Sequence, residues 1–253
     1  MRKNLVINTK DSVLYYPQAT EKFNLLDETF LEFIAEENVV AVKIPSIISK
    51  EVLDKCGYFT TFPQHLTRLK PYNESTNSSE RYLTPAACIH IYPMLEKECL
   101  VQTCYTTLTE VFRYENGMFE EPERLWEFSV REMVFVGTPN YVLSSLNKVK
   151  EKALTVARKV NESAKIVESN DIFYPTRNNQ LKMRMQRKNK LKEELIIPYG
   201  ERSIAVASFN YHQFHFSKLF NFDQNGKIVT GCVGFGLDRW FICMNQKERK
   251  HET

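Results

Sequence analysis

Two segments of the sequence place charged or small side chains where they could bind a polar ligand. Residues 108–115 have the alternating pattern of a β-strand, which puts Arg113 and Glu115 on one face because side chains alternate with a period of two. The pair can hold an anion and a hydrogen-bond donor, although alone it is more typical of an exposed ion pair. Residues 231–240 combine small residues with Arg239, which would project from the first turn of a helix. Alone, this segment is also typical of a packing turn with a surface arginine.

The strand that carries Arg113 needs a neighbour to hold it in place. Residues 125–136 predict a second strand, with Phe128 and Glu132 on one face. The connection between the two strands, residues 116–124, is polar and contains a glycine and a proline. This pattern favours an antiparallel hairpin with a long loop.

The remaining patterns interleave helices with strands. A threonine followed by proline is typical of a helix start, because threonine caps the helix and proline suits its first turn. The sequence predicts helices over 21–37, from Thr84, from Thr138 and from Leu237, and further strands over 39–48, 204–211 and 227–232. The predicted fold class is therefore α+β, an antiparallel sheet flanked by helices, in a single domain over residues 1–253.

Composition narrows the class of protein. The chain has 253 residues, of which 43% are hydrophobic, so it can build a full core. A net charge of +3 is too small to indicate a nucleic-acid coat. No apolar run approaches the roughly 18 residues that a membrane span needs, and the start of the chain lacks the long apolar stretch of a secretory signal. We therefore expect a soluble cytoplasmic protein that does not contact membranes.

Taken together and in this order, the motifs resemble the catalytic core of the class II aminoacyl-tRNA synthetases. The first motif of that family is similar to residues 42–46, the second to residues 112–115 and 127–132, and the third to residues 234–239. The resemblance covers most of the chain, from Val42 to Trp240. It implies the synthetase-like antiparallel sheet flanked by helices, an ATP site and, through the first motif, a homodimer.

The resemblance implies a role in ATP binding for four side chains. Arg113 would bind the α-phosphate and the substrate carboxylate, and Glu115 would accept a hydrogen bond from the adenine amino group. Phe128 would stack on one face of the adenine and Arg239 on the other. Arg113 and Arg239 would be the catalytic residues, because fixed cations stabilise the charge that builds up on the α-phosphate.

A narrower resemblance implies a metal. Residues 83–88 resemble the segment that binds the substrate amine in seryl-tRNA synthetases, but they offer Cys88 in a region where the ordinary enzymes use glutamate. The atypical zinc-dependent seryl enzymes, and the amino acid:[carrier protein] ligases similar to them, hold zinc with two cysteines and a glutamate, which match Cys88, Glu132 and Cys232. Three ligands leave one tetrahedral position for the substrate amine. Without the resemblance, these would be three unrelated buried side chains. The other cysteines are interpreted as structural: Cys56, Cys99, Cys104 and Cys243.

Residues 208–212 resemble the carrier-protein ligases closely. The resemblance assigns Ser208 and Asn210 to the amino acid pocket, whereas the alternative is a strand end with satisfied polar groups. A second family-like segment, 192–195, assigns Glu194 to the same pocket. ATP chemistry implies Mg²⁺, but the nearest counterpart of the family's magnesium ligand is Glu201, so the sequence assigns no protein ligand to that ion.

These features predict an adenylate-forming ligase. It would use ATP to activate a small amino acid and transfer it to the phosphopantetheine thiol of an acyl or peptidyl carrier protein. The sequence shows no obvious arm for transfer RNA, so tRNA is not the expected acceptor. Two alternatives remain: an aminoacyl-tRNA ligase with a separate tRNA-binding partner, and a non-catalytic synthetase-like binding or regulatory module. The presence of both motif arginines disfavours the second.

One basic run has no role in the motifs. It could dock an acidic carrier protein by electrostatic steering, contact RNA phosphates, or be a solvated surface. Its members are Lys182, Arg184, Arg187, Lys188, Lys190 and Lys192.

Overall fold

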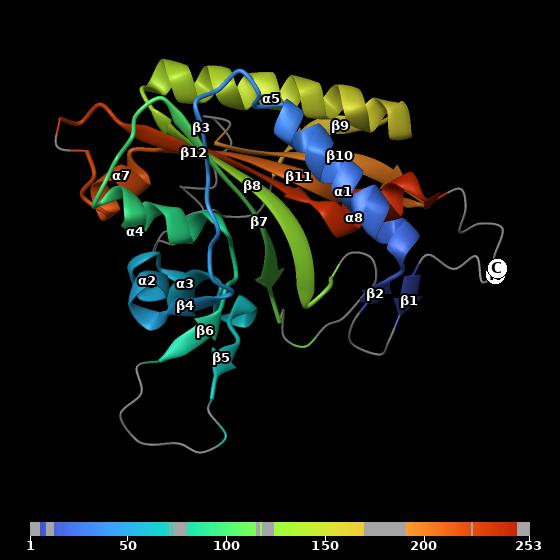
Figure 1. Cartoon of the computed structure of the whole chain (residues 1–253), viewed down its shortest axis with the longest axis horizontal. Helices are drawn as coiled ribbons and strands as arrows, with labels where there is room; N and C mark the ends of the chain where they lie inside the picture. The colour runs from blue at the N-terminus through green and yellow to red at the C-terminus, as the bar shows by residue number, and fades with distance from the viewer. Residues whose placement is uncertain are drawn as a thin grey trace.

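The computed structural model describes residues 6–8, 13–70, 72, 80–114, 117, 124–169, 191–223 and 225–246. Its centre is a seven-stranded sheet with the order β3-β7-β8-β12-β11-β10-β9 (Figure 1). The strands of this sheet are β3 (Val39–Ala41), β7 (Thr103–Phe112), β8 (Glu127–Gly137), β9 (Lys165–Glu168), β10 (Lys192–Tyr199), β11 (Arg202–Gln213) and β12 (Val229–Gly236). A separate two-stranded sheet consists of β1 (Val6–Asn8) and β2 (Val13–Tyr15).

The sheet is mixed rather than purely antiparallel as predicted. Within the described part of the chain, β3 pairs with β7 in parallel, with Val39 opposite Cys104. The other five neighbouring pairs in this sheet are antiparallel. A parallel neighbour requires a long crossover connection, and residues 42–102 provide one. The α+β class is kept, because the predicted hairpin between β7 and β8 is present.

Alternate residues of the central strands face two separate cores. On β8, Met133 and Phe135 pack in one apolar cluster with residues of three helices, α1 (Pro17–Glu32), α5 (Pro139–Val160) and α8 (Leu237–Met244). Val134 points the other way and packs in a second cluster with Cys88 and Cys232. In Figure 1, α5 and α1 cross the sheet on the side of the first cluster. The three helices therefore cover the first face, and Cys88 and Cys232 lie on the second.

Helix α5 begins where the sequence predicts. The Thr138 side chain accepts a hydrogen bond from the backbone N–H of Tyr141, and proline follows at the first helical position. The helix packs so closely on β12 that a Cβ added at Gly231 would lie 2.8 Å from Leu146 Cδ1 and 3.0 Å from the carbonyl oxygen of Asn210. Glycine at this position therefore allows the approach between helix and sheet.

Helix α1 is tied to the sheet by an ion pair. Arg131 donates from Nε and Nη2 to the two carboxylate oxygens of Asp27, each at 2.6 Å. Both side chains are largely buried, so this bidentate geometry fixes the helix more firmly than a surface pair would. The helix spans Pro17–Glu32 rather than the predicted 21–37, because Pro17 occupies its first turn.

The second face of the sheet carries short elements (Figure 1). They are β4 (Ile47–Ser49), α2 (Lys50–Lys55), α3 (Tyr58–Thr61), the 3₁₀ turn η1 (Pro63–His65), β5 (Arg68–Leu69), β6 (Arg81–Leu83), the 3₁₀ turn η2 (Cys88–His90), α4 (Ile91–Leu95) and α7 (His215–Leu219). The short strands form a three-stranded sheet in the order β4-β6-β5. Tyr92 of α4 stacks on Phe216 of α7, with ring centroids 3.8 Å apart.

The predicted helix start at Thr84 is wrong. Thr84 lies outside any helix: its N–H donates to the carbonyl of Ser46, and its carbonyl accepts from the N–H of Phe112. Its hydroxyl bonds the carbonyl of Pro45 at 3.2 Å and meets Nε2 of His90 at 2.9 Å. These partners hold the segment away from helical geometry, so Cys88 lies in the turn η2 instead.

Candidate metal and substrate site

One row of side chains crosses the second face of the sheet. The antiparallel register pairs Thr107 of β7 with Glu132 of β8, Glu132 with Gly234 of β12, Gly234 with Ser208 of β11, and Ser208 with Glu194 of β10. Directly paired residues of neighbouring strands point to the same face. Five positions that are far apart in the sequence therefore line one strip of the sheet.

Glu132 of this strip is one of three potential metal ligands that converge. Cys232 lies two residues before Gly234 on β12, and Cys88 comes from the turn η2. The ligand atoms of Cys88, Glu132 and Cys232 all lie within 4.8 Å of one another, and all three side chains are buried. The structure thus brings together the three residues that the sequence predicts as ligands.

The electrostatics of this cluster favour a bound cation. Burial raises the pKa of the Glu132 carboxyl to about 7, although a hydrogen bond from Cys232 and the charge of Arg113 oppose the shift. The pKa of the Cys232 thiol is raised well above its usual value, first by its hydrogen bond with Cys88 and then by burial. A bound cation would offset the cost of burying the charged forms of Glu132 and Cys232. Two sulfurs and one carboxylate are a donor set that suits zinc.

Asn210 supports the cluster from the neighbouring strand. It is paired with Cys232 and donates from Nδ2 to Cys232 Sγ at 3.5 Å and to Ser208 Oγ at 3.3 Å. Its Oδ1 atom is buried and has no hydrogen-bond partner among the described residues. Asn210 therefore links Cys232 to Ser208 of the predicted amino acid pocket. Its Oδ1 atom can still accept a hydrogen bond.

Glycine at position 234 keeps space open between Glu132 and Ser208. A Cβ at this position would lie 3.0 Å from Glu132 Oε2 and 3.7 Å from Ser208 Oγ. Glu194 lies one strand beyond Ser208, where it accepts from Ser169 Oγ at 3.0 Å and pairs with Lys192 at 3.5 Å. Ser208 and Glu194 thus share the strip, with Ser208 the nearer of the two to the ligand cluster.

The predicted nucleotide residues are partly brought together. Arg113 follows the end of β7, donates from Nε to the carbonyl of Pro85 at 3.0 Å, and lies over the Phe128 ring at 5.3 Å from its centroid. Arg239, in the first turn of α8, donates to the carbonyl of Ala205 at 3.0 Å. Glu115 lies outside the described residues, so the structure gives no account of it.

Further residues near the cluster escape sequence analysis. Thr107 is one, and Tyr58 of α3 is another: burial and then the nearby Cys88 raise the pKa of its hydroxyl, which the positive charge of Arg113 opposes. Cys56, interpreted as structural, packs against the cluster that contains Cys88, and burial raises the pKa of its thiol to about 12. Thr107 is placed beside the site by the register of β7 and β8, and Tyr58 and Cys56 by the packing of the segment that contains α2 and α3, so no local sequence signal could have found them.

The basic run falls mostly outside the described residues. Lys192 is described, at the start of β10, and Lys182, Arg184, Arg187, Lys188 and Lys190 are not.

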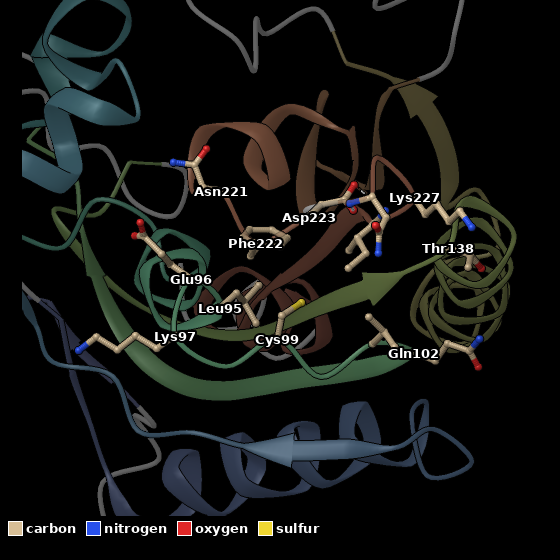
Figure 2. A pocket seen from close by; sticks show the side chains of 13 residues that line it. Leu95, Glu96, Lys97, Cys99, Gln102, Thr138, Asn221, Phe222, Asp223 and Lys227 are labelled. Carbon is tan, nitrogen blue, oxygen red and sulfur yellow. Dashed lines mark hydrogen bonds between the residues drawn. The ribbon is translucent and has the colours of Figure 1, made fainter.

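A pocket of about 490 Å³ lies elsewhere, beside the start of α5 (Figure 2). Its lining includes Leu95, Cys99, Thr138, Phe222 and Asp223, and none of the predicted site residues that the structure describes. In the described part of the chain, no helix is both long enough and apolar enough to cross a membrane.

The fold is that of the class II aminoacyl-tRNA synthetase catalytic domain. It matches the seryl-tRNA synthetase of Methanopyrus kandleri, solved with a selenocysteine tRNA of A. aeolicus, with a TM-score of 0.78 and 21% identity over 95% of this chain. It also matches the Giardia lamblia prolyl-tRNA synthetase bound to prolyl-adenylate, with a TM-score of 0.75 and 15% identity over 96% of this chain. The chain spans 55% and 50% of the lengths of these two structures.

In sequence, the chain is similar to amino acid–[acyl-carrier-protein] ligases. It is 29% identical to ligase 1 of Bradyrhizobium diazoefficiens over 83% of this chain and 72% of that protein, and 28% identical to ligase 2 of the same organism over 83% and 70%. A type-2 serine–tRNA ligase of Methanopyrus kandleri is 30% identical over 63% of this chain, which spans only a third of that relative. No family model matches the chain. The expected resemblance and fold are thereby confirmed.

Proposed function

We propose that this protein uses ATP to activate a small amino acid and transfers it to the phosphopantetheine thiol of a carrier protein. The observation that carries the proposal is the convergence of Cys88, Glu132 and Cys232 in a buried site on the same face of the sheet as Ser208. The similarity to proteins named amino acid–[acyl-carrier-protein] ligases supports the choice of acceptor.

In this proposal Cys88, Glu132 and Cys232 would hold Zn²⁺. When bound, the ion would bind the free α-amino group of the substrate and so select an amino acid. Asn210, which donates to Cys232 Sγ, keeps that ligand in place. Its spare Oδ1 acceptor and the hydroxyl of Ser208 face the substrate, and Glu194 completes the far side of the pocket.

Arg113 aligns the reacting groups. Its guanidinium binds the substrate carboxylate and the α-phosphate of ATP, while a carboxylate oxygen attacks the α-phosphorus. The bond from the α-phosphorus to the bridging oxygen breaks, and pyrophosphate leaves with the electron pair. Charge builds up on the α-phosphate during this step, so a fixed cation there lowers the barrier. The carboxylate is already ionised, so no protein base is needed.

Three further residues would hold the nucleotide. Phe128, whose ring lies under the Arg113 guanidinium, offers a stacking surface for adenine. We assign Arg239 to the opposite adenine face and Glu115 to the adenine amino group. Magnesium would arrive with ATP. Glu201 lies in the exposed turn between β10 and β11, and we assign no protein ligand to the ion.

The second half-reaction transfers the acyl group. The sulfur of the phosphopantetheine thiol attacks the carbonyl carbon of the aminoacyl adenylate, the thiol proton passes to solvent, and AMP leaves as the thioester forms. The type-2 serine–tRNA ligase similarity makes a tRNA hydroxyl the second candidate acceptor.

We also propose a homodimer formed through the first motif. The side chains of Val39, Ile47 and Leu108 are apolar and exposed, and Val39 lies on β3, a strand at the edge of the sheet. An exposed edge of this kind is suited to pairing with a second copy. Light scattering on the purified protein tests this directly, and a monomer at working concentration would reject it.

Amino-acid-dependent exchange between ATP and pyrophosphate tests the activity. Each of the standard amino acids is assayed, and small ones such as glycine and alanine are expected to give exchange. The intact mass of a holo-carrier protein is then compared with acylation of total RNA. No exchange with any amino acid would reject an adenylate-forming enzyme and leave a binding or regulatory module. Charging of RNA but not of the carrier would favour the tRNA alternative.

A further inference from the structure

Thr107 has a buried hydroxyl that makes no hydrogen bond to the described residues. The residue is 2% exposed, and its Oγ1 atom has no hydrogen-bond partner among the described residues. Buried hydroxyls are almost always hydrogen-bonded, because leaving one unsatisfied costs free energy. Thr106, its neighbour, illustrates the contrast: that hydroxyl donates to the carbonyl of Glu132 at 2.8 Å and accepts from Arg131 Nη1 at 3.3 Å.

The register puts Thr107 beside one candidate ligand. Thr107 pairs directly with Glu132, so their side chains share a face and their Cβ atoms are about 4.5–5.5 Å apart, as in antiparallel pairs generally. Strand β8 lies between β7 and β12. Glu132 Oε2 lies close to Gly234 on the β12 side, and Thr107 lies on the opposite, β7 side.

We propose that Thr107 is a positioning residue that, once a metal is bound, donates a hydrogen bond to the Glu132 carboxylate oxygen that does not bind the metal, a bond that Thr107 Oγ1 does not make in this structure. A carboxylate has two oxygens, and a ligating carboxylate is normally held by a partner outside the metal's own ligands. Thr107 supplies such a donor on the flank away from Gly234, so the space beside Gly234 stays free for substrate. This inference rests on the proposed metal site and names a residue that orients one of its ligands.

The test measures zinc affinity rather than activity. The protein is stripped with a chelator and titrated with Zn²⁺ in competition with a chromophoric chelator. Thr107→Val keeps the shape and removes the hydroxyl, so it should weaken zinc binding by about tenfold or more. Thr107→Ser keeps the hydroxyl and should bind like the wild type. Thr109→Val is the matched control, because Thr109 lies on the same face of the same strand and is paired with Val130.

The possible results distinguish a failure of the Thr107 role from a failure of the proposed metal site. Wild-type affinity in Thr107→Val, or an equal loss in Thr109→Val, would overturn the role of Thr107 and leave the metal site intact. A wild-type protein that binds no zinc would overturn both. If Thr107→Val does not fold, Thr107→Ala replaces it and must show the same tenfold loss relative to Thr107→Ser; equal affinity of those two variants would reject the inference.

Discussion

Cys88 reaches the ligand cluster from outside the sheet, whereas Glu132 and Cys232 lie on neighbouring strands. The two strand residues are held by the ladder between β8 and β12, in which Glu132 pairs with Gly234 and Cys232 with Val134. Cys88 has no such ladder, and its position depends on the bonds of Thr84 and on the packing of η2 against β8. Loss of Cys88 should therefore remove a ligand without disturbing the other two.

Cys88→Ala should abolish both bound zinc and activation of the amino acid. Zinc content is measured by metal analysis of the purified protein, and activation by exchange between ATP and pyrophosphate. Cys99→Ala is the control, because Cys99 lines the separate pocket beside α5 and should leave both properties unchanged. Full zinc occupancy in Cys88→Ala would remove this residue from the site.

Gly234→Ala tests the open space between Glu132 and Ser208. The added methyl would lie 3.0 Å from Glu132 Oε2, so either the carboxylate or the strand must move. We expect activation of the preferred amino acid to fall by at least about tenfold in kcat/KM, which corresponds to about 1.4 kcal/mol of lost transition-state stabilisation. The exchange assay measures this fall. Unchanged kinetics would mean that the space is not used.

At the scale of elements, Gly231→Ala should loosen the contact between α5 and β12. Its Cβ would lie 2.8 Å from Leu146 Cδ1 and 2.9 Å from Val142 Cγ1, and relieving that overlap should lower the free energy of unfolding by about 1–3 kcal/mol. Gly236→Ala is the control on the same strand, because the nearest atoms to its Cβ are 3.9 Å away. Urea unfolding of both variants measures the difference. Equal stabilities would show that the helix adjusts freely.

The elements that the sequence predicts well are those determined by local rules. The cap at Thr138 and the alternation of β8 depend on neighbouring residues alone, and both predictions are confirmed. The start at Thr84 and the parallel pairing of β3 depend on distant partners such as Ser46 and β7, which no local pattern specifies.

Within the site, the same distinction holds. The sequence predicts the three residues that cluster as potential ligands only through resemblance to a known family, because their spacing along the chain has no period. The roles of Thr107 and Gly234 depend on the register of three strands, since a one-residue slip of a strand would turn its position to the other face of the sheet. The register is determined by the pairing of the whole sheet, so the sequence of a single strand does not specify it.

At the scale of the whole molecule, the charge of the basic run tests whether a carrier protein is the acceptor. Reversal of Lys188 and Lys190 to glutamate should slow carrier loading and spare exchange between ATP and pyrophosphate, because electrostatic steering acts on association with the partner. Reversal of Lys148 and Lys159, exposed residues of α5, gives a control with the same change in net charge. Equal loss of loading and exchange would count against docking.

Removal of the metal should destabilise the folded protein as a whole. The three ligands come from η2, β8 and β12, so only the folded chain can offer them together, and a ligand that binds only the native state stabilises it by mass action. Zinc at a free concentration of 100 times its Kd should add about 2.7 kcal/mol to the free energy of unfolding. Thermal unfolding of the chelator-stripped protein, with and without added Zn²⁺, measures the gain. Cys88→Ala should show none of it, and Mg²⁺ should not substitute, because thiolates are poor ligands for a hard cation. The same zinc-induced shift in Cys88→Ala would mean that zinc stabilises the protein from another site.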